Sequence, residues 1–190
     1  MKKLYIIHRW EGSPEESLHK WLKVEAEKLG FEVLVPAMPE TDEPRVETWV
    51  PFLNDLIGTP DESTFFIGHS IGCQAILRYF ETLPEGTKIG GAIFIAGWYE
   101  VQNLETEDEV RIVKPWLETP RNDDKIKKIT DGKTIVILSD NDQWVSLENK
   151  ALWEERAGAK VVVESGKGHF IEEDGVMSLP SALQALVEMK

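Results

Sequence analysis

The sequence predicts an α/β protein, a compact three-layer sandwich in which helices cover both faces of a mostly parallel sheet of about six strands. Six short runs of apolar and β-branched residues recur along the chain, and most are apolar throughout, as in strands buried on both faces. Helical patterns lie between these runs, which favours parallel strands joined by right-handed crossovers. The length of 190 residues suits a single domain over residues 1–190.

The first half of the chain is expected to contain three strands and two helices. Residues 4–7, 32–35 and 64–67 are short apolar runs, and the first of them reads Leu-Tyr-Ile-Ile. Residues 16–29 and 46–57 have apolar side chains three or four positions apart, which predicts amphipathic helices. The apolar positions are Leu18, Trp21, Leu22, Val24 and Leu29 in the first helix and Trp49, Val50, Leu53, Leu56 and Ile57 in the second.

The second half of the chain continues the alternation. Residues 72–82 carry Ala75, Ile76, Leu77 and Phe80 at helical spacing, directly after the third strand. The remaining strands are expected over residues 92–95, 134–138 and 160–163, and the remaining helices over residues 147–157 and 181–189.

Residues 97–128 interrupt this alternation. The segment is longer than a usual connection and combines Trp98, Tyr99 and Trp116 with prolines and many acidic residues. It is too short for a separate domain, so we expect a small, partly helical, cap-like insertion over the carboxyl edge of the sheet. The ligand crevice of such sheets lies at that edge. A plain surface excursion is the alternative.

Composition excludes several classes of function. The net charge is −13, from 34 acidic and 21 basic side chains, so nucleic-acid binding is not expected. No stretch approaches the roughly 20 apolar residues of a membrane span, and the apolar run near Met1 is too short for a signal peptide. The single cysteine, Cys73, rules out an intramolecular disulfide, which fits a reducing compartment. We therefore expect a cytoplasmic protein with no membrane partner.

The most informative motif is Gly68-His69-Ser70-Ile71-Gly72. The pattern G-x-S-x-G, between a β-rich run and a helical one, is typical of a sharp strand–turn–helix elbow that exposes a serine hydroxyl. The glycines are expected where neighbouring segments pass too close for a Cβ atom. A serine hydroxyl is a poor nucleophile without a base, so the rest of the chain must supply one.

Four histidines compete for the role of base. His169 follows the sixth strand in the loop Ser-Gly-Lys-Gly-His-Phe, which can deliver its side chain to the crevice. His69 lies inside the elbow and points the wrong way, so packing or hydrogen bonding is expected of it. His8 ends the first strand, and His19 is expected to be solvent-exposed or partly packed on its helix. We favour His169.

The orienting acid is expected after the fifth strand, where Asp140 and Asp142 compete. Asp142 precedes Gln-Trp-Val, an arrangement that lets its carboxylate turn inward, whereas Asp140 can hold the turn by accepting backbone amides. The Asp-x-Asp spacing also resembles the start of a calcium loop, but the glycine and distal glutamate are missing in register. No phosphate-binding loop, dinucleotide fingerprint or metal cluster is present, so neither cofactor nor metal is expected.

The chain order Ser70, Asp142, His169 is that of the α/β-hydrolase fold. In this arrangement His169 takes the serine proton and Asp142 fixes the imidazole tautomer. The oxyanion would be bound by the backbone amide of Ile71 and by an amide of the loop after the first strand, with Trp10 as the favoured donor.

These residues resemble the small serine hydrolases of the YdeN and retinoblastoma-binding protein nine type. The shared residues are Met38-Pro39, Trp49, Pro51-Phe52-Leu53, Gly68-His69-Ser70-Ile71-Gly72-Cys73, Ala75-Ile76-Leu77-Arg78, Asp142-Gln143, Val145, Gly168-His169-Phe170, Glu173, Gly175 and Ser178-Leu179-Pro180. The resemblance implies a compact α/β-hydrolase that lacks the first two strands of larger relatives, with Ser70, Asp142 and His169 as its triad. The sequence departs from that family at Arg9, where many relatives have glycine, and at Ser146, where relatives often have proline.

The expected activity is hydrolysis of a small-molecule carboxylic ester or thioester through an acyl-serine intermediate. Two alternatives stay open: a small-peptide or amide hydrolase, and a catalytically weak binding or scaffolding protein. Arg9 motivates the second, because a bulky charged residue there can alter the oxyanion loop or gate the pocket. Candidate pocket-lining residues are Arg9, His8, Trp98, Trp116 and Trp144, although the tryptophans can equally cover the core of the insertion.

Overall fold

The computed structural model of the protein describes residues 1–190 and contains one six-stranded sheet. All strand pairs are parallel, and the spatial order is β2-β1-β3-β4-β5-β6. The strands are β1 (Lys2–Ile7), β2 (Phe31–Leu34), β3 (Thr64–His69), β4 (Gly91–Ile95), β5 (Thr134–Ser139) and β6 (Lys160–Glu164). The six-stranded α/β-hydrolase architecture expected from the sequence is confirmed, and the sheet is entirely parallel.

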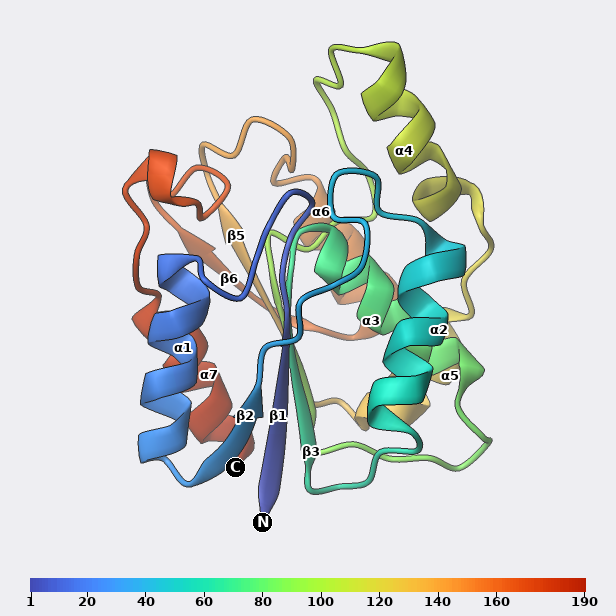
Figure 1. Cartoon of the computed structure of the whole chain (residues 1–190), viewed down its shortest axis with the longest axis vertical. Helices are drawn as coiled ribbons and strands as arrows, with labels where there is room; N and C mark the ends of the chain where they lie inside the picture. Colours follow the sequence, from blue (N-terminus) through green and yellow to red (C-terminus); the bar gives the residue numbers. More distant parts are fainter.

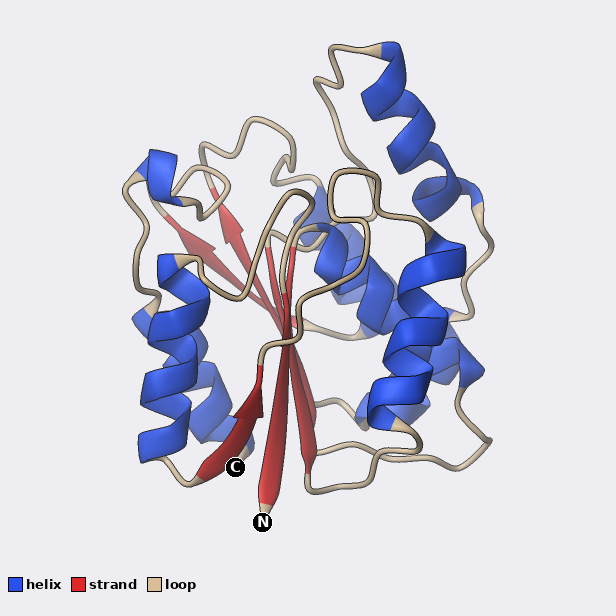
Figure 2. Ribbon diagram, in the orientation of Figure 1, coloured by secondary structure: helices blue, strands red, loops and turns tan.

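Helices flank the sheet on both sides (Figures 1 and 2). They are α1 (Ser17–Lys28), α2 (Val46–Ile57), α3 (Ile71–Thr82), α4 (Glu107–Glu118), α5 (Asp123–Thr130), α6 (Asn149–Leu152) and α7 (Pro180–Met189). In Figure 1, α1 and α7 lie on the left of the sheet, whereas α2, α3 and α5 lie on the right. None of these helices has the length and apolar character needed to cross a membrane.

Two apolar cores separate the three layers, and alternate residues of one strand serve different cores. In β1, Leu4 and Ile6 join the core beneath α1 and α7, whereas Tyr5 and Ile7 join the core beneath α2 and α3. This division follows from the alternating direction of side chains along a strand. It explains why the strands are apolar on both faces in the sequence.

The interruption at residues 97–128 contains two helices with different positions. Helix α5 contributes Ile126 and Ile129 to the core beneath α2 and α3, as a crossover helix between β4 and β5 does. Helix α4 instead stands beyond the carboxyl ends of the strands, at the upper right of Figure 1. Thr106 caps α4 in a reciprocal box with Glu109, which satisfies the first amides of this helix.

The expected helix over residues 147–157 is shorter and less regular. It begins at Asn149, and its second half, Trp153–Ala157, is a π-helical stretch. Asn149 is buried, and its side chain bonds the backbone of Tyr99 and Glu100 across the insertion. This connection fixes the start of the insertion beside the loop that follows β5.

Candidate active site

Ser70 occupies a sharp elbow between β3 and α3. Its backbone has φ of 53° and ψ of −119°, a conformation that costs energy for a residue with a Cβ atom. The surrounding contacts enforce it, because a Cβ at Gly72 would lie 2.3 Å from the carbonyl oxygen of Ile7, and one at Gly68 would lie 2.8 Å from the backbone of Cys73. The elbow therefore holds the Ser70 hydroxyl at the carboxyl end of the sheet.

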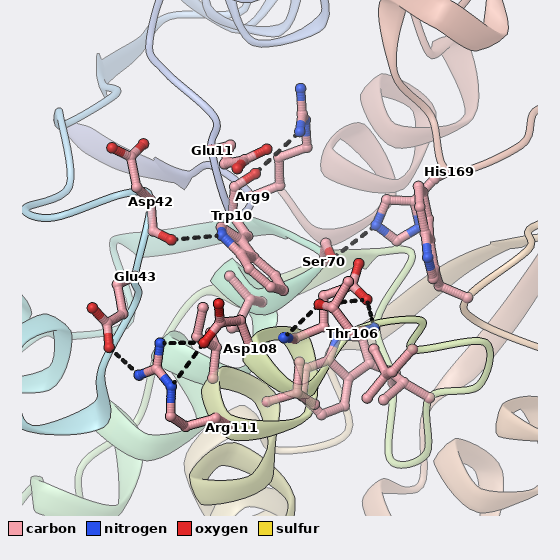
Figure 3. A pocket seen from close by; sticks show the side chains of 18 of the residues that line it. Arg9, Trp10, Glu11, Asp42, Glu43, Ser70, Thr106, Asp108, Arg111 and His169 are labelled. Carbon is pink, nitrogen blue, oxygen red and sulfur yellow. Dashed lines mark hydrogen bonds and ion pairs between the residues drawn. The ribbon is translucent and has the colours of Figure 1, made fainter.

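The structure brings three sequence-predicted residues into one hydrogen-bonded row. The Oγ atom of Ser70 lies 2.8 Å from Nε2 of His169, and Nδ1 of His169 lies 2.7 Å from Oδ2 of Asp142. Figure 3 shows the contact between Ser70 and His169. Asp142 and His169 are buried and Ser70 is half-buried. Such a row can pass the hydroxyl proton to the imidazole while the carboxylate steadies the ring.

The two aspartates that follow β5 have different partners. Asp142 uses its other oxygen, Oδ1, to accept the backbone amides of Trp144 and Val145 at 2.9 and 3.1 Å, so its carboxylate is held from both sides. Asp140 is exposed and accepts the amide of Gly166 and the hydroxyl of Ser165. These bonds, the amide first, lower the pKa of Asp140. Asp140 thus ties down the loop after β6 and does not contact His169.

Further polar contacts fix the loop that carries His169. The Gly168 amide donates to Oδ1 of Asn141, and the His169 amide donates to Asp174 at 2.6 Å. His169 itself is covered by the ring of Trp144, edge-on, with ring centroids 5.0 Å apart. The imidazole is therefore confined by its backbone, by its carboxylate partner and by an aromatic wall.

The loop after β1 lies against Ser70 on the other side of the site. The Glu11 amide donates to the carbonyl of Thr41, and the Trp10 indole donates to the carbonyl of Asp42. The backbone amide of Trp10 has no acceptor within the chain, and Ile71 is the first residue of α3, where amides have no partner inside the helix. Both residues line the cavity in front of Ser70, as an oxyanion-binding pair requires.

Arg9 is held away from the reacting atoms. Its Nε and Nη2 atoms lie 2.8 and 2.7 Å from Oε1 of Glu16, and its Nη1 donates to the carbonyl of Trp10. In Figure 3 its guanidinium group points away from Ser70. Arg9 therefore braces the outer side of this loop.

A cavity of about 530 Å³ opens in front of Ser70 (Figure 3). Its apolar wall comes mostly from the insertion and from the loop after β5, namely Trp98, Val101, Leu104, Ile112, Val113, Trp144 and Val145. Its polar residues other than Ser70 and His169 are Arg9, Glu11, Asp42, Glu43, Thr106, Asp108, Glu109 and Arg111. Carboxylates outnumber guanidinium groups, so the mouth carries net negative charge.

Two of the candidate pocket residues do not line this cavity, which corrects the expectation for His8 and Trp116. His8 is fully buried, where its Nε2 accepts the Met38 amide and its Nδ1 lies 2.9 Å from the carbonyl of Arg9. Trp116, a residue of α4, is buried on the inner side of this helix, and its indole donates to the carbonyl of Pro44. Arg9, Trp98 and Trp144 do line it.

Sequence reasoning missed several residues around the site. His19 is buried rather than exposed, because its ring packs beneath the loop after β1 and against His69. Asn141 and Asp174 hold the base loop, yet neither belongs to a local motif. The charged residues of α4 and of the loop after β2 approach Ser70 only through tertiary packing. No local pattern signals such contacts.

A thiol nucleophile has little support in the structure. Cys73 is buried in α3, and burial raises the pKa of its thiol, which disfavours the nucleophilic thiolate. No group of three or more His, Cys, Asp or Glu side chains is arranged to hold a metal ion.

Comparison with known proteins finds similarity over nearly the whole chain. A family model described as serine hydrolase matches residues 4–188. YdeN of Bacillus subtilis is 33% identical, covering 97% of this chain and 94% of its own. The serine hydrolase RBBP9 of Rattus norvegicus is 26% identical, covering 86% of this chain and 78% of its own.

Solved structures show the same architecture. The crystal structure of YdeN has a TM-score of 0.89 at 28% identity and covers 100% of this chain and 98% of its own. Est1E from Butyrivibrio proteoclasticus, solved with ferulic acid bound, has a TM-score of 0.72 at 17% identity and covers 100% of this chain and 89% of its own. The likeness to Est1E, at 17% identity, is evidence of a shared fold alone.

Proposed function

Because the chain belongs to the serine hydrolase family, we propose that it cleaves a carboxylic ester or thioester through an acyl-serine intermediate. Ser70 is the nucleophile, His169 the general base and then the general acid, and Asp142 the residue that orients the imidazole. The observation that carries the proposal is the row of contacts at 2.8 and 2.7 Å from Ser70 through His169 to Asp142.

The proposed reaction has two halves. Ser70 Oγ attacks the substrate carbonyl carbon while its proton passes to Nε2 of His169. The tetrahedral intermediate places its negative oxygen near the amides of Trp10 and Ile71, and the imidazolium then protonates the departing alcohol or thiol. Water next attacks the acyl-serine with His169 again acting as base, which releases the acid and restores Ser70.

The contacts of the aspartates support the assignment of Asp142. Its Oδ2 accepts from His169 while Oδ1 is held by two backbone amides, so the carboxylate cannot rotate away without losing several hydrogen bonds. A fixed acceptor at Nδ1 leaves Nε2 unprotonated and facing the serine hydroxyl, which is the tautomer the first step needs.

The cavity supports a small to medium acyl or aromatic substrate. The volume of about 530 Å³ lies within the range of small-molecule sites, and the tryptophans and aliphatic side chains of its wall suit an apolar group. We propose that the segment 97–128, with α4, acts as a small cap that shapes this wall.

A fluorophosphonate probe tests the proposal directly. Wild-type protein should be labelled at Ser70, and S70A should lose the label while keeping its circular dichroism spectrum. A series of p-nitrophenyl esters of increasing chain length then measures acyl preference, with matched thioesters and p-nitroanilides to compare leaving groups. Wild-type protein that stays unlabelled between pH 6 and 9, with no turnover of any substrate, would favour the binding or scaffolding alternative.

A further inference from the structure

A buried row of imidazoles connects α1 to the base loop. Nε2 of His19 lies 3.4 Å from Nδ1 of His69, and Nε2 of His69 lies 2.9 Å from the carbonyl oxygen of His169. His19 and His69 are each 1% exposed. At the other end of the row, Nδ1 of His19 lies 3.1 Å from both the Ser13 carbonyl and Oε2 of Glu16.

We propose that His19 and His69 are positioning residues that hold the backbone of His169 through one shared extra proton, with Glu16 as its counter-charge. The role is structural support of the proposed base, because neither ring lines the cavity. The kinetic part of this inference rests on the proposed function, whereas the proton count does not.

Counting protons along the row supports a net positive charge. The Ser13 carbonyl and the Glu16 carboxylate only accept, so Nδ1 of His19 must carry hydrogen. The His169 carbonyl also only accepts, so Nε2 of His69 must carry hydrogen. If both rings were neutral, their remaining nitrogens would face each other as two buried lone pairs without a donor. One more proton between them makes an N–H···N hydrogen bond.

The only carboxylate in contact with the pair is Glu16, on the His19 side, so the shared proton belongs to the His19 end of the contact. Burial, with the charges of neighbouring groups, holds the pKa of His69 well below its usual range, so His69 is the acceptor. His19 instead faces Glu16. Burial acts to raise the pKa of Glu16, but its hydrogen bond to His19 and the charges of His19 and Arg9 outweigh burial and lower it. A carboxylate kept ionised in this way is a fitting partner for an imidazolium.

The other charged and titratable groups come from several elements packed around the pair. His8 and Arg9 lie in the loop after β1, His169 lies in the loop after β6, and Glu172 accepts the Ser17 amide at the start of α1. Burial, as the largest cause, lowers the pKa of His8 and favours its neutral ring. Glu16 also pairs with Arg9. It therefore connects the loop after β1, which carries Trp10, to the His19–His69 pair behind the His169 loop.

The arrangement predicts a loss of positioning at high pH. When the shared proton leaves, the contact between His19 and His69 becomes repulsive, and His69 loses the neighbour that fixes its ring. The hold of His69 on the His169 carbonyl then weakens, so kcat should fall on the alkaline side. Because a single proton is shared, its loss should change the environment of both rings at the same pH.

Nuclear magnetic resonance of protein labelled with ¹⁵N-histidine tests the proton count without any substrate. At pH 7 we expect both ring nitrogens of His19 to be protonated, His69 to be the neutral Nε2–H tautomer, and the two rings to change together as the pH rises. A neutral His19 at pH 7, or rings that titrate independently, would overturn the proposal whether or not the protein hydrolyses esters.

The kinetic arm compares E16Q with E15Q, the same change at an exposed neighbour that pairs with Lys20. Without its counter-charge, the alkaline limb of kcat should move down by about 1 pH unit in E16Q and stay in place in E15Q. E16D keeps the charge and should restore the limb at least in part. An unmoved limb in a folded E16Q would contradict the positioning role, and the resonance experiment on wild-type protein decides the matter if E16Q does not fold.

Discussion

Arg111 of α4 forms an ion pair with Glu43 of the loop that precedes α2, and both residues line the mouth of the cavity (Figure 3). Asp108 also contacts Arg111, so the guanidinium group joins two carboxylates. A second connection, from the Trp116 indole to the Pro44 carbonyl, lies deeper. Together these contacts attach α4 to the body of the domain.

We expect R111Q to loosen α4 without unfolding the protein. Backbone amides of residues 107–118 should exchange with deuterium faster, because local opening loses one of its restraints. K114Q is the matched control, since Lys114 pairs with Glu118 within the same helix. Equal exchange rates in both variants would show that the ion pairs of Arg111 do not restrain the helix.

Substrate charge should affect turnover. Glu11 and Asp42 line the cavity mouth and have no cationic partner, so an anionic ester should be hydrolysed less efficiently than a neutral or cationic ester of equal size. The discrimination should shrink as salt rises, because exposed charges are screened. The discrimination should also shrink in E11Q/D42N. It should not shrink in E62Q/E85Q, which removes the same amount of negative charge at two positions that precede β3 and β4. If the discrimination persists in E11Q/D42N, its cause is the shape of the substrate and not its charge.

The two aspartates after β5 should differ sharply in kinetic effect. D142N should lower kcat by a factor on the order of 10⁴, because an amide favours the wrong imidazole tautomer. D140N removes the acceptor of Ser165 and Gly166 and should cost much less. Steady-state kinetics on one ester compares them, and a larger loss in D140N would reverse the assignment.

Gly72 should tolerate no side chain. A Cβ there would meet the backbone of β1 and of His8, which cannot move aside, so G72A should lose roughly 1–3 kcal/mol or more of unfolding free energy. Gly86 has open space around it and a positive φ of 83°, so G86A reports backbone strain alone, about 1–2 kcal/mol. Urea denaturation measures both, and a G72A variant of wild-type stability would contradict the close approach.

His8 should make the free energy of unfolding depend on pH below about 7. Burial lowers its pKa in the folded state, so below about 6.5 the unfolded chain binds more protons there and stability falls as the pH falls. The neutral ring suits its contacts, since protonated Nε2 could no longer accept the Met38 amide. H8N should therefore lose stability less steeply on acidification, by up to about 1.4 kcal/mol per pH unit. Urea denaturation of both proteins at pH 7 and 5.5 measures this. An equal loss of unfolding free energy in wild-type protein and H8N would contradict the prediction.

The sequence was sufficient for the architecture because strand and helix periodicities are local properties. It was also sufficient to bring Ser70, Asp142 and His169 together, since each follows a parallel strand and all such loops meet at one edge. The burial of a polar residue, by contrast, cannot be predicted from local periodicity. His19 sits between Leu18 and Lys20, and no pattern there indicates that tertiary packing closes over its ring.

The insertion shows the same limit. Its length and tryptophans indicated an additional element near the site, but Trp98 faces the cavity and Trp116 faces the core beneath α4. Which way each indole turns depends on distant partners, here the Pro44 carbonyl for Trp116. The role of Arg9 was equally non-local, because Glu16 determines where its guanidinium group lies.

The strand order has a consequence for how the site is completed. From β4 onward every strand joins the sheet beside the one before it, and β6 closes the outer edge. The loops bearing Ser70 and Asp142 therefore precede the loop bearing His169 both along the chain and across the sheet, and the row of three side chains is complete only once β6 and its loop are in place. A chain truncated before residue 169 would therefore keep the elbow at Ser70 and lack its proposed base.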